Sequence, residues 1–502
     1  MPDMSQVQPV AFNCEGGLVL NRSTFMMQAG EALELQNFEP DIEGGYRRIN
    51  GFSKYVSAVV PYTSSSSEKV LMVATFGDYV IAARGTGIYS ATAGGSSWTT
   101  RDSGRTSAGK YSYERFNFDG TDKIIVVDGA NDPTVFNSSL AATDVTESTV
   151  EGSKYVAAFK NHMFYAGKSS TPQTLVFSQP NDEDAFSSGS GAGSIKVDDT
   201  ITGLKVFRDN LFIFCQNRIF KLNGSTSSDF AITPVTRSIG CINGDTIQEF
   251  AGDIVFLGPD GLRTVAGTER IGDVELGTIS RQIQKRFEAL TDVDEFTSVV
   301  IPDKTQYRIF FSNASTVRAS TEGIICVRRG EGYEFGDTLG IRASATDSTV
   351  VAGTSFILHG DFDGYVYRQE QGNDFDGNQI VGKYRSPDLT MGDAGIRKNF
   401  QRVIINYAPE AAVNADLFLR YDYEAPDVAR PAAYPFDTST VVAVYGSAIY
   451  NTSTYGGQTN PLVRQPVEGS GFAVALRVND RGTSAPYSLK GFQLEFDAGA
   501  RR

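Results

Sequence analysis

The chain has 502 residues, and its 59 acidic against 45 basic side chains give a net charge of −14. Only two histidines and four widely spaced cysteines are present, which argues against histidine-based catalysis, a zinc cluster and a dense disulfide framework. The acidic balance argues against a protein that wraps nucleic acid. No run of about 18 apolar residues occurs, so we expect no membrane-spanning segment.

The N-terminal segment, residues 1–45, begins Met-Pro-Asp-Met and has no basic stretch leading into an apolar one. We therefore do not expect a secretion signal, and the scattered thiols agree with synthesis in a reducing host cytoplasm. The segment lacks the repeat that follows it. We expect an extended N-terminal arm over 1–45, which could supply a strand that closes a ring.

Residues 46–382 carry a repeat in which an aromatic or apolar residue precedes a polar turn and two short apolar strands. The first five copies start 42, 41, 48 and 43 residues apart, and the remaining gap of 101 holds two units. A repeat of this length built from short strands is typical of a β-propeller blade. The leading residues of the copies are Phe76, Phe118, Phe159, Phe207, Phe250, Tyr307 and Val351.

We therefore predict an all-β fold with a β-propeller of about six to seven blades over 46–382. A large β-sandwich with evenly spaced hairpins is the alternative. The 51 glycines agree with either fold, because many follow Asp or Asn in pairs that favour tight hairpin turns. These pairs are Asp119-Gly120, Asn223-Gly224, Asn243-Gly244, Asp260-Gly261, Asp363-Gly364 and Asp376-Gly377.

One segment breaks the strand pattern. Ile279, Ile283, Phe287 and Leu290 recur at helical spacing. We predict a single inserted amphipathic helix over 279–291, with Thr278 or Ser280 as its cap, whose apolar side packs on the propeller.

The C-terminal segment, residues 383–502, has longer strands with alternating apolar and polar residues, separated by prolines. Strict alternation indicates one buried and one solvated face. We predict an additional C-terminal antiparallel β-domain that resembles a sandwich. The strands are expected at Val403–Tyr407, Leu417–Tyr423, Phe472–Val478 and Phe492–Phe496.

Candidate chemical groups are few. Asp361 and Asp363, and likewise Asp374 and Asp376, are spaced as in calcium loops, but no downstream glutamate completes the set, so turn aspartates are the competing interpretation. Ser90–Trp98 resembles a degenerate sialidase-type Asp-box without its acid.

Three arginine pairs could contact phosphate, although a solvated face is the simpler interpretation. They are Arg47-Arg48, Arg328-Arg329 and Arg501-Arg502. No phosphate-binding glycine loop, nucleophile elbow or zinc motif is present. We therefore assign no catalytic, cofactor-binding or metal-binding residue, expect no cofactor, and expect that the protein is not an enzyme.

Several short patches resemble the tail nozzle, or hub, proteins of short-tailed bacteriophages, which are β-propeller proteins of the head–tail connector. The patches cover much of the chain, but each is short and degenerate. They are Leu33–Pro40 with Gly44–Gly51, Leu175–Ser178 with Phe186, Gly382–Gly392 and Gly491–Phe496.

This resemblance implies a virion structural protein in the phage tail: a homo-oligomer, in that family a ring of six, below the portal and adaptor. Such a ring encloses the exit channel for double-stranded DNA and offers a docking surface for fibres or spikes. The resemblance assigns no residue to the channel lining. An acidic lining would repel the duplex and favour rapid ejection, a hypothesis that rests on the net charge of −14. The competing functions are a glycan-binding or glycan-hydrolysing, sialidase-like propeller and a monomeric scaffold propeller.

Overall fold

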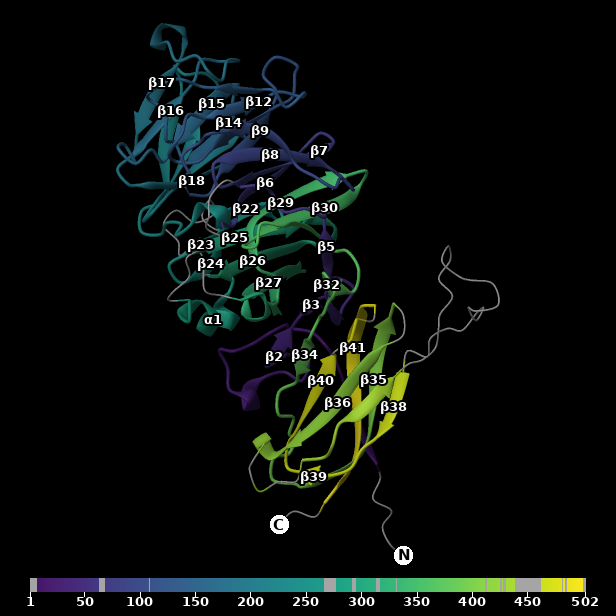
Figure 1. Cartoon of the computed structure of the whole chain (residues 1–502). Helices are drawn as coiled ribbons and strands as arrows, with labels where there is room; N and C mark the ends of the chain where they lie inside the picture. Colours follow the sequence, from purple (N-terminus) through teal and green to yellow (C-terminus); the bar gives the residue numbers. More distant parts are fainter. Residues whose placement is uncertain are drawn as a thin grey trace, which may run out of the picture.

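The computed structural model describes residues 7–62, 68–107, 109–265, 277–290, 295–312, 317–330, 332–410, 413–424, 427, 430–437, 462–480, 482–483 and 485–499. These residues are almost entirely β-structure, in eight sheets. Seven of the sheets contribute the blades of a propeller. The eighth packs with an extension of one blade to form a second module, which lies beside the propeller in Figure 1.

The first four blades are antiparallel sheets of four strands each, in simple chain order. They comprise β6 (Val70–Phe76), β7 (Tyr79–Arg84), β8 (Gly87–Thr92) and β9 (Thr99–Ser103); β10 (Ser112–Phe116), β11 (Lys123–Val127), β12 (Thr134–Phe136) and β13 (Ala142–Asp144); β14 (Tyr155–Phe159), β15 (His162–Ala166), β16 (Thr174–Phe177) and β17 (Gly193–Lys196); β18 (Ile201–Phe207), β19 (Asn210–Cys215), β20 (Ile219–Asn223) and β21 (Ala231–Thr236).

The fifth blade has three described strands, and the sixth and seventh have four. The first strand of each blade lies innermost, and that of the seventh blade packs against that of the first, so the ring is closed. These blades comprise β22 (Gln248–Phe250), β23 (Asp253–Gly258) and β24 (Gly261–Thr264); β25 (Glu295–Ile301), β26 (Gln306–Ser312), β27 (Glu322–Arg329) and β28 (Gly332–Leu339); β29 (Ala343–Val351), β30 (Thr354–Asp361), β31 (Val366–Gln369) and β5 (Phe52–Lys54).

The predicted propeller is thus confirmed, with six blades of four strands and one of three. In six of the seven repeat copies, the leading residue lies at or just after the end of an innermost strand, before the first hairpin. Tyr307 is the exception, because it lies inside β26. At Lys160 and Asn161 the hairpin uses two positive φ angles, 48° and 60°, the geometry that matches strand twist.

The middle strands of the blades are apolar on both faces because each blade packs against two neighbours. In β11, Ile124 and Val126 belong to the core shared with the first blade, whereas Ile125 and Val127 belong to the core shared with the third. Burying both faces explains why such strands are continuous apolar runs rather than alternating ones.

The strand that closes the ring comes from the N-terminal part of the chain. β5 pairs antiparallel with β31 and is followed in the same sheet by β32 (Asp374–Phe375) and β33 (Asn378–Gln379). Ring closure by an early strand was expected within 1–45, but the strand lies just beyond that boundary.

The second module is a sandwich of two sheets. One sheet contains β1 (Gln8–Asn13), β3 (Phe38–Pro40), β4 (Tyr46–Arg48), β35 (Lys398–Pro409), β38 (Leu462–Pro466), β39 (Ser470–Gly471) and β41 (Tyr487–Ala498). The other continues the sixth blade beyond β28 through β2 (Glu34–Gln36), β34 (Gly382–Arg385), β40 (Val474–Asp480), β36 (Asn414–Tyr421) and β37 (Tyr434–Asp437).

Both sheets of the sandwich include N-terminal strands, so the described part of 1–45 is not a separate arm. Leu35 and Phe38 are fully buried in the sandwich core, and this burial explains why the segment docks. The predicted C-terminal strands over 383–502 correspond to β35, β36, β40 and β41.

The predicted helix over 279–291 is shorter than expected. A 3-10 turn, Arg281–Ile283, leads into α1 (Gln284–Glu288), and the described chain leaves the helix at Ala289. The apolar side was predicted to pack on the propeller, and Ile283 is buried in one core with Leu262 of the fifth blade, with Phe287 packed against that core. The other 3-10 turns are Thr24–Met26, Ser188–Ser190, Gly244–Thr246, Pro302–Lys304, Arg318–Ser320 and Asp422–Glu424.

The Asn243-Gly244 pair, expected as a hairpin turn, is instead the start of a 3-10 turn. The Asn243 side chain accepts a hydrogen bond from the backbone N–H of Asp245 and caps the turn Gly244–Thr246. At Asp376-Gly377, by contrast, both φ angles are positive, 52° and 87°, as the hairpin interpretation requires.

Candidate functional site

The propeller and the sandwich are joined through a shared sheet. Gln36 of β2 is paired with Asp337 of β28, and the other edge of β2 pairs with β34. The backbone N–H of Asn37 donates to the carbonyl of Asp337 at 2.8 Å. The N-terminal strand therefore lies between the two modules and hydrogen-bonds to both.

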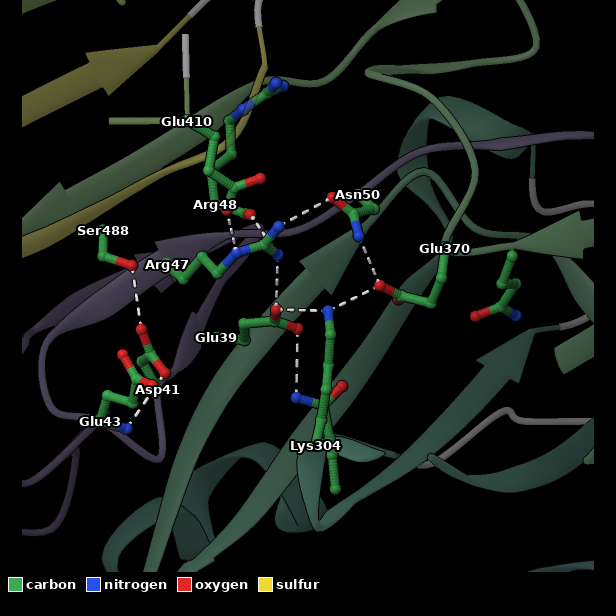
Figure 2. Close-up of polar contacts among 12 residues, drawn as sticks. Glu39, Asp41, Glu43, Arg47, Arg48, Asn50, Lys304, Glu370, Glu410 and Ser488 are labelled. Atoms are coloured by element: carbon green, nitrogen blue, oxygen red, sulfur yellow. Dashed lines mark hydrogen bonds and ion pairs between the residues drawn. The ribbon is translucent and has the colours of Figure 1, made fainter. Parts of the chain in front are cut away.

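A cluster of buried charges lies at the same junction (Figure 2). Figure 2 shows Glu39 of β3 bound by the guanidinium of Arg47, at 3.1 Å, and by the ammonium of Lys304, at 2.6 Å. The guanidinium of Arg308 also binds Glu39, at 3.0 Å. Glu370 binds Lys304 at 2.6 Å and Arg308 at 2.7 Å. We call these five residues the junction cluster.

The junction cluster connects the two modules, since Glu39 and Arg47 belong to sandwich strands, whereas Lys304, Arg308 and Glu370 belong to the sixth and seventh blades. Burial alone would raise the pKa of the Glu39 carboxyl, but the facing cations outweigh it and hold the pKa below its ordinary value. The same balance lowers the pKa of Glu370. Both carboxylates therefore stay charged at neutral pH.

A second buried ion pair lies nearby in the sandwich. Arg48 of β4 binds Asp480 of β40 at 3.0 Å, and its side chain is fully buried. The prediction that Arg47 and Arg48 form a solvated face is therefore wrong, because both side chains are engaged in ion pairs with buried carboxylates. Arg328 and Arg329 also have protein partners, the carbonyl of Ala251 and the carboxylate of Glu334. Arg501-Arg502 lies outside the described residues.

The propeller has a central cavity of about 410 Å³, which the innermost segments of all seven blades line. The described lining is largely polar. Its charged side chains are Lys110, Glu114, Arg115, Lys205, Asp245 and Asp347.

Four of these charges are paired across the cavity. Lys110 binds Asp245 at 3.3 Å, and Arg115 binds Asp347 at 2.7 Å. Asp347 also accepts from the hydroxyls of Tyr113 and Thr75, both at 2.7 Å. These bridges connect the second blade to the fifth, seventh and first blades, so they fill part of the cavity.

Several polar groups on the lining remain without a partner in the part of the chain that the structure describes, including the buried hydroxyl of Tyr111. Within the described structure, Glu114 on β10, Tyr155 on β14 and Lys205 on β18 make no hydrogen bond or ion pair, although each side chain is half-buried. Withdrawal from water raises the pKa of Glu114 to about 7, despite the opposing attraction of Lys205 and Arg115.

The candidate calcium loops are turns. The Asp361 carboxylate accepts from the backbone N–H groups of Asp363 and Tyr365, both at 2.9 Å, and pairs with Arg318 at 2.7 Å. Asp374 likewise accepts from the backbone N–H of Gly377. Among the described residues, no group of three or more His, Cys, Asp or Glu side chains is placed to hold a metal ion.

The segment that resembles an Asp-box positions an aromatic ring. Trp98 donates from its indole nitrogen to the carbonyl of Ala58 at 3.1 Å and packs against the core between the first and seventh blades. The segment therefore acts as a structural turn here. No described helix is long and apolar enough to cross a membrane.

Sequence reasoning missed both the junction cluster and the unpartnered cavity residues. The sequence does contain a signal for one residue of the junction cluster, Arg308. Arg308 interrupts the apolar run of β26, between Tyr307 and Ile309, and a charge inside a buried strand implies a buried partner. That signal cannot identify Glu39, which lies 269 residues away in the sequence.

Comparisons with known proteins concern the fold. No model of a known protein family matches the sequence, and no curated protein matches it. Solved structures that are similar include the extracellular domain of a putative one component system from B. thetaiotaomicron, at 9% identity over 64% of this chain, with a TM-score of 0.40. This chain spans 40% of that protein's length.

Two further similar structures are eukaryotic. The Pan2 WD40 domain of Neurospora crassa is 9% identical over 64% of this chain and 96% of that domain, with a TM-score of 0.40. Raptor from Chaetomium thermophilum is 10% identical over 64% of this chain and 29% of the Raptor chain, again with a TM-score of 0.40. The fold is a β-propeller with an attached C-terminal antiparallel β-module.

Proposed function

We propose that this chain is a structural, non-enzymatic protein of a phage virion: a tail nozzle or hub that assembles as a ring below the portal and adaptor. The resemblance of its sequence implies a ring of six copies. The ring would surround the exit path of double-stranded DNA, without sequence-specific binding, and its outer surface would carry fibres or spikes. The sequence patches at Leu33–Pro40 and Gly382–Gly392 support this assignment, and both contribute strands to the junction between the modules.

The observation that carries the proposal is the continuous connection between propeller and sandwich. A shared nine-stranded sheet and the junction cluster join the two modules. Rotating one module against the other would separate buried charges from their partners, which is costly. Because relative rotation of the two modules is costly, the connection suits a structural part of an assembly better than a pair of domains that move against each other during catalysis.

The central cavity favours a DNA path between protomers. Its volume is about 410 Å³, and the Lys110–Asp245 and Arg115–Asp347 bridges cross it, which leaves no room for a duplex. The channel of the proposed ring would therefore be formed by several copies around a common axis. An acidic wall on that axis would let DNA pass without being held.

A sialidase-type function has less support. Such a site needs an arginine triad, whereas Arg115 is the only arginine among the described residues that line the cavity. Its Nε and Nη2 atoms already donate to Thr75 and Asp347.

The proposal is tested by the mass and shape of the purified full chain, measured by light scattering and negative-stain microscopy, together with antibody labelling of virions. We expect a ring with a central hole, a mass about six times that of one chain, and label confined to the tail. A monomer at every concentration, with no label on virions, would contradict the proposal. Release of a fluorophore from a sialoside substrate would support the hydrolase instead.

A further inference from the structure

Three unpartnered groups lie on the innermost strands of three consecutive blades. Glu114 belongs to the second blade, Tyr155 to the third and Lys205 to the fourth, and all three line the central cavity. Glu114 and Lys205 attract each other electrostatically, yet no ion pair within 4.0 Å joins them in the described structure. The other four charges on the lining are paired.

The cavity lining therefore has two kinds of polar side chain: those that pair with each other across the cavity, and those that have no protein partner among the described residues. Polar side chains withdrawn from water are normally satisfied by protein partners, as Asp347 is by Tyr113, Thr75 and Arg115. The carboxyl of Glu114, the phenol of Tyr155 and the ammonium of Lys205 are only partly buried, and they make no hydrogen bond or ion pair within the described structure that holds the blades together. Such groups are available to a ligand.

We propose that the central cavity binds a small hydroxylated carboxylate, of the size and chemistry of a sugar acid, between Glu114, Tyr155 and Lys205. The ligand carboxylate would bind the ammonium of Lys205 in a charge-assisted hydrogen bond. Its hydroxyl groups would donate to Glu114 and exchange a hydrogen bond with Tyr155.

The cavity supports this class of ligand in three ways. Its volume of about 410 Å³ lies in the lower part of the usual range for small-molecule sites. Its lining is mostly polar, so an apolar ligand would leave all three groups unsatisfied. A metal ion would find one carboxylate, Glu114, that is not already engaged, which is too few oxygen ligands for a stable site.

The cavity is accessible to solvent on the side of Arg115. The Arg115 side chain is 37% exposed, whereas that of Asp347 behind it is 3% exposed. The Nη1 atom of Arg115 makes no hydrogen bond in the described structure, since Nε and Nη2 make the contacts to Thr75 and Asp347. It can therefore serve as a second donor to an incoming carboxylate.

The test is a titration of the purified full chain with D-glucuronate, followed by saturation-transfer NMR and calorimetry, with D-glucose as the probe that lacks the carboxylate. We expect saturable binding of one glucuronate per chain and binding of glucose at least tenfold weaker. Lys205→Gln should weaken glucuronate binding at least tenfold, and Tyr155→Phe should weaken it several-fold. Lys196→Gln is the matched control, because Lys196 is exposed on β17 and does not line the cavity.

Circular dichroism and the unfolding midpoint show whether each variant folds. If Lys205→Gln does not fold, Glu114→Gln takes its place, with an expected loss of discrimination between glucuronate and other small carboxylates. The proposal is overturned if glucuronate shows no saturable binding at about 10 mM, if glucose binds as well as glucuronate, or if the variants bind like wild type. The proposed ligand site lies within a single chain, so glucuronate can bind even if the chain forms no ring. Conversely, the chain can form a ring even if glucuronate does not bind.

Discussion

Glu39 and Arg308 are 269 residues apart in the sequence, yet they form an ion pair of 3.0 Å in which the side chains are 3% and 1% exposed. One partner belongs to the sandwich and the other to the sixth blade. The pair therefore reports directly on whether the two modules are docked.

Replacing Glu39 should loosen this docking. Glu39→Gln leaves Lys304 and Arg308 facing each other in a buried space with one carboxylate fewer, and we expect a loss of about 3–5 kcal/mol in the free energy of unfolding. Urea denaturation measures the loss. Glu43→Gln, at an exposed position in the turn between β3 and β4, is the control and should leave stability within about 0.5 kcal/mol of wild type.

The junction cluster should also make stability depend on acid. The pKa values of Glu39 and Glu370 are lowered from 4.5 in the folded chain, so the unfolded chain takes up protons first as the pH falls. Their contribution is present above about pH 4.5 and is lost below it. Unfolding free energies from pH 7 to pH 3 test this, and a Glu39→Gln deficit that stays constant over the whole range would contradict it.

Glu114 should change the folding stability with pH in the opposite direction to Glu39 and Glu370. Its pKa is raised from 4.5 to about 7, so the folded chain holds the proton more tightly and wild-type stability falls as the pH rises from about 4.5 to 7. Glu114→Gln removes that dependence. We expect the variant to be more stable than wild type by about 1–2 kcal/mol at pH 8, after allowance for partial solvent exposure, and equal to it near pH 4. A variant less stable at pH 8 would contradict the assigned environment.

Ring closure should be sensitive to Gly51. A Cβ atom at this position would lie 1.8 Å from the carbonyl oxygen of Asp374, a backbone atom that cannot rotate away. Gly51→Ala should therefore displace β5 from the seventh blade and cost at least about 2 kcal/mol. Hydrogen exchange at β31 should increase in the variant. Gly277→Ala, where a Cβ meets nothing within 4 Å, should exchange like wild type.

The four cysteines should be unreactive in the folded chain. Cys14, Cys215, Cys241 and Cys326 are free and buried, and burial raises the pKa of each thiol, to about 12 for Cys215 and Cys241. A thiol reagent at pH 8 should label none of them before the protein unfolds and all four afterwards. Rapid labelling of any one under native conditions would show that its part of the core opens.

The propeller could be predicted from the sequence because its signals are local. A hairpin such as Phe159–His162 is specified by neighbouring residues. The same hairpin pattern recurs at a regular spacing in the amino-acid sequence, so the repeat can be recognised. The sandwich could be predicted only in its C-terminal half. Pairing of β1 and β4 with β41 joins opposite ends of the chain, and nothing in the short N-terminal strands identifies that distant partner.

The candidate sites were harder to predict for the same reason. Glu114, Tyr155 and Lys205 come from three different repeat copies, and each looks like an ordinary blade residue in its own sequence context. Only closure of the ring brings them to one cavity. The helix was overestimated because helical spacing continues to Leu290, whereas the described chain leaves the helix at Ala289.

The position of the N-terminal strands has a consequence for biosynthesis. β1 and β4 pair with β41, and β5 pairs with β31, so the earliest strands to leave the ribosome have partners made near the end of translation. At about 5–20 residues per second, the interval before β41 emerges is roughly 20–90 seconds. During that time Leu35 and Phe38 have no complete core to enter. A nascent chain that stops before β31 can complete neither module, and one that stops between β31 and β41 can close the propeller but not the sandwich.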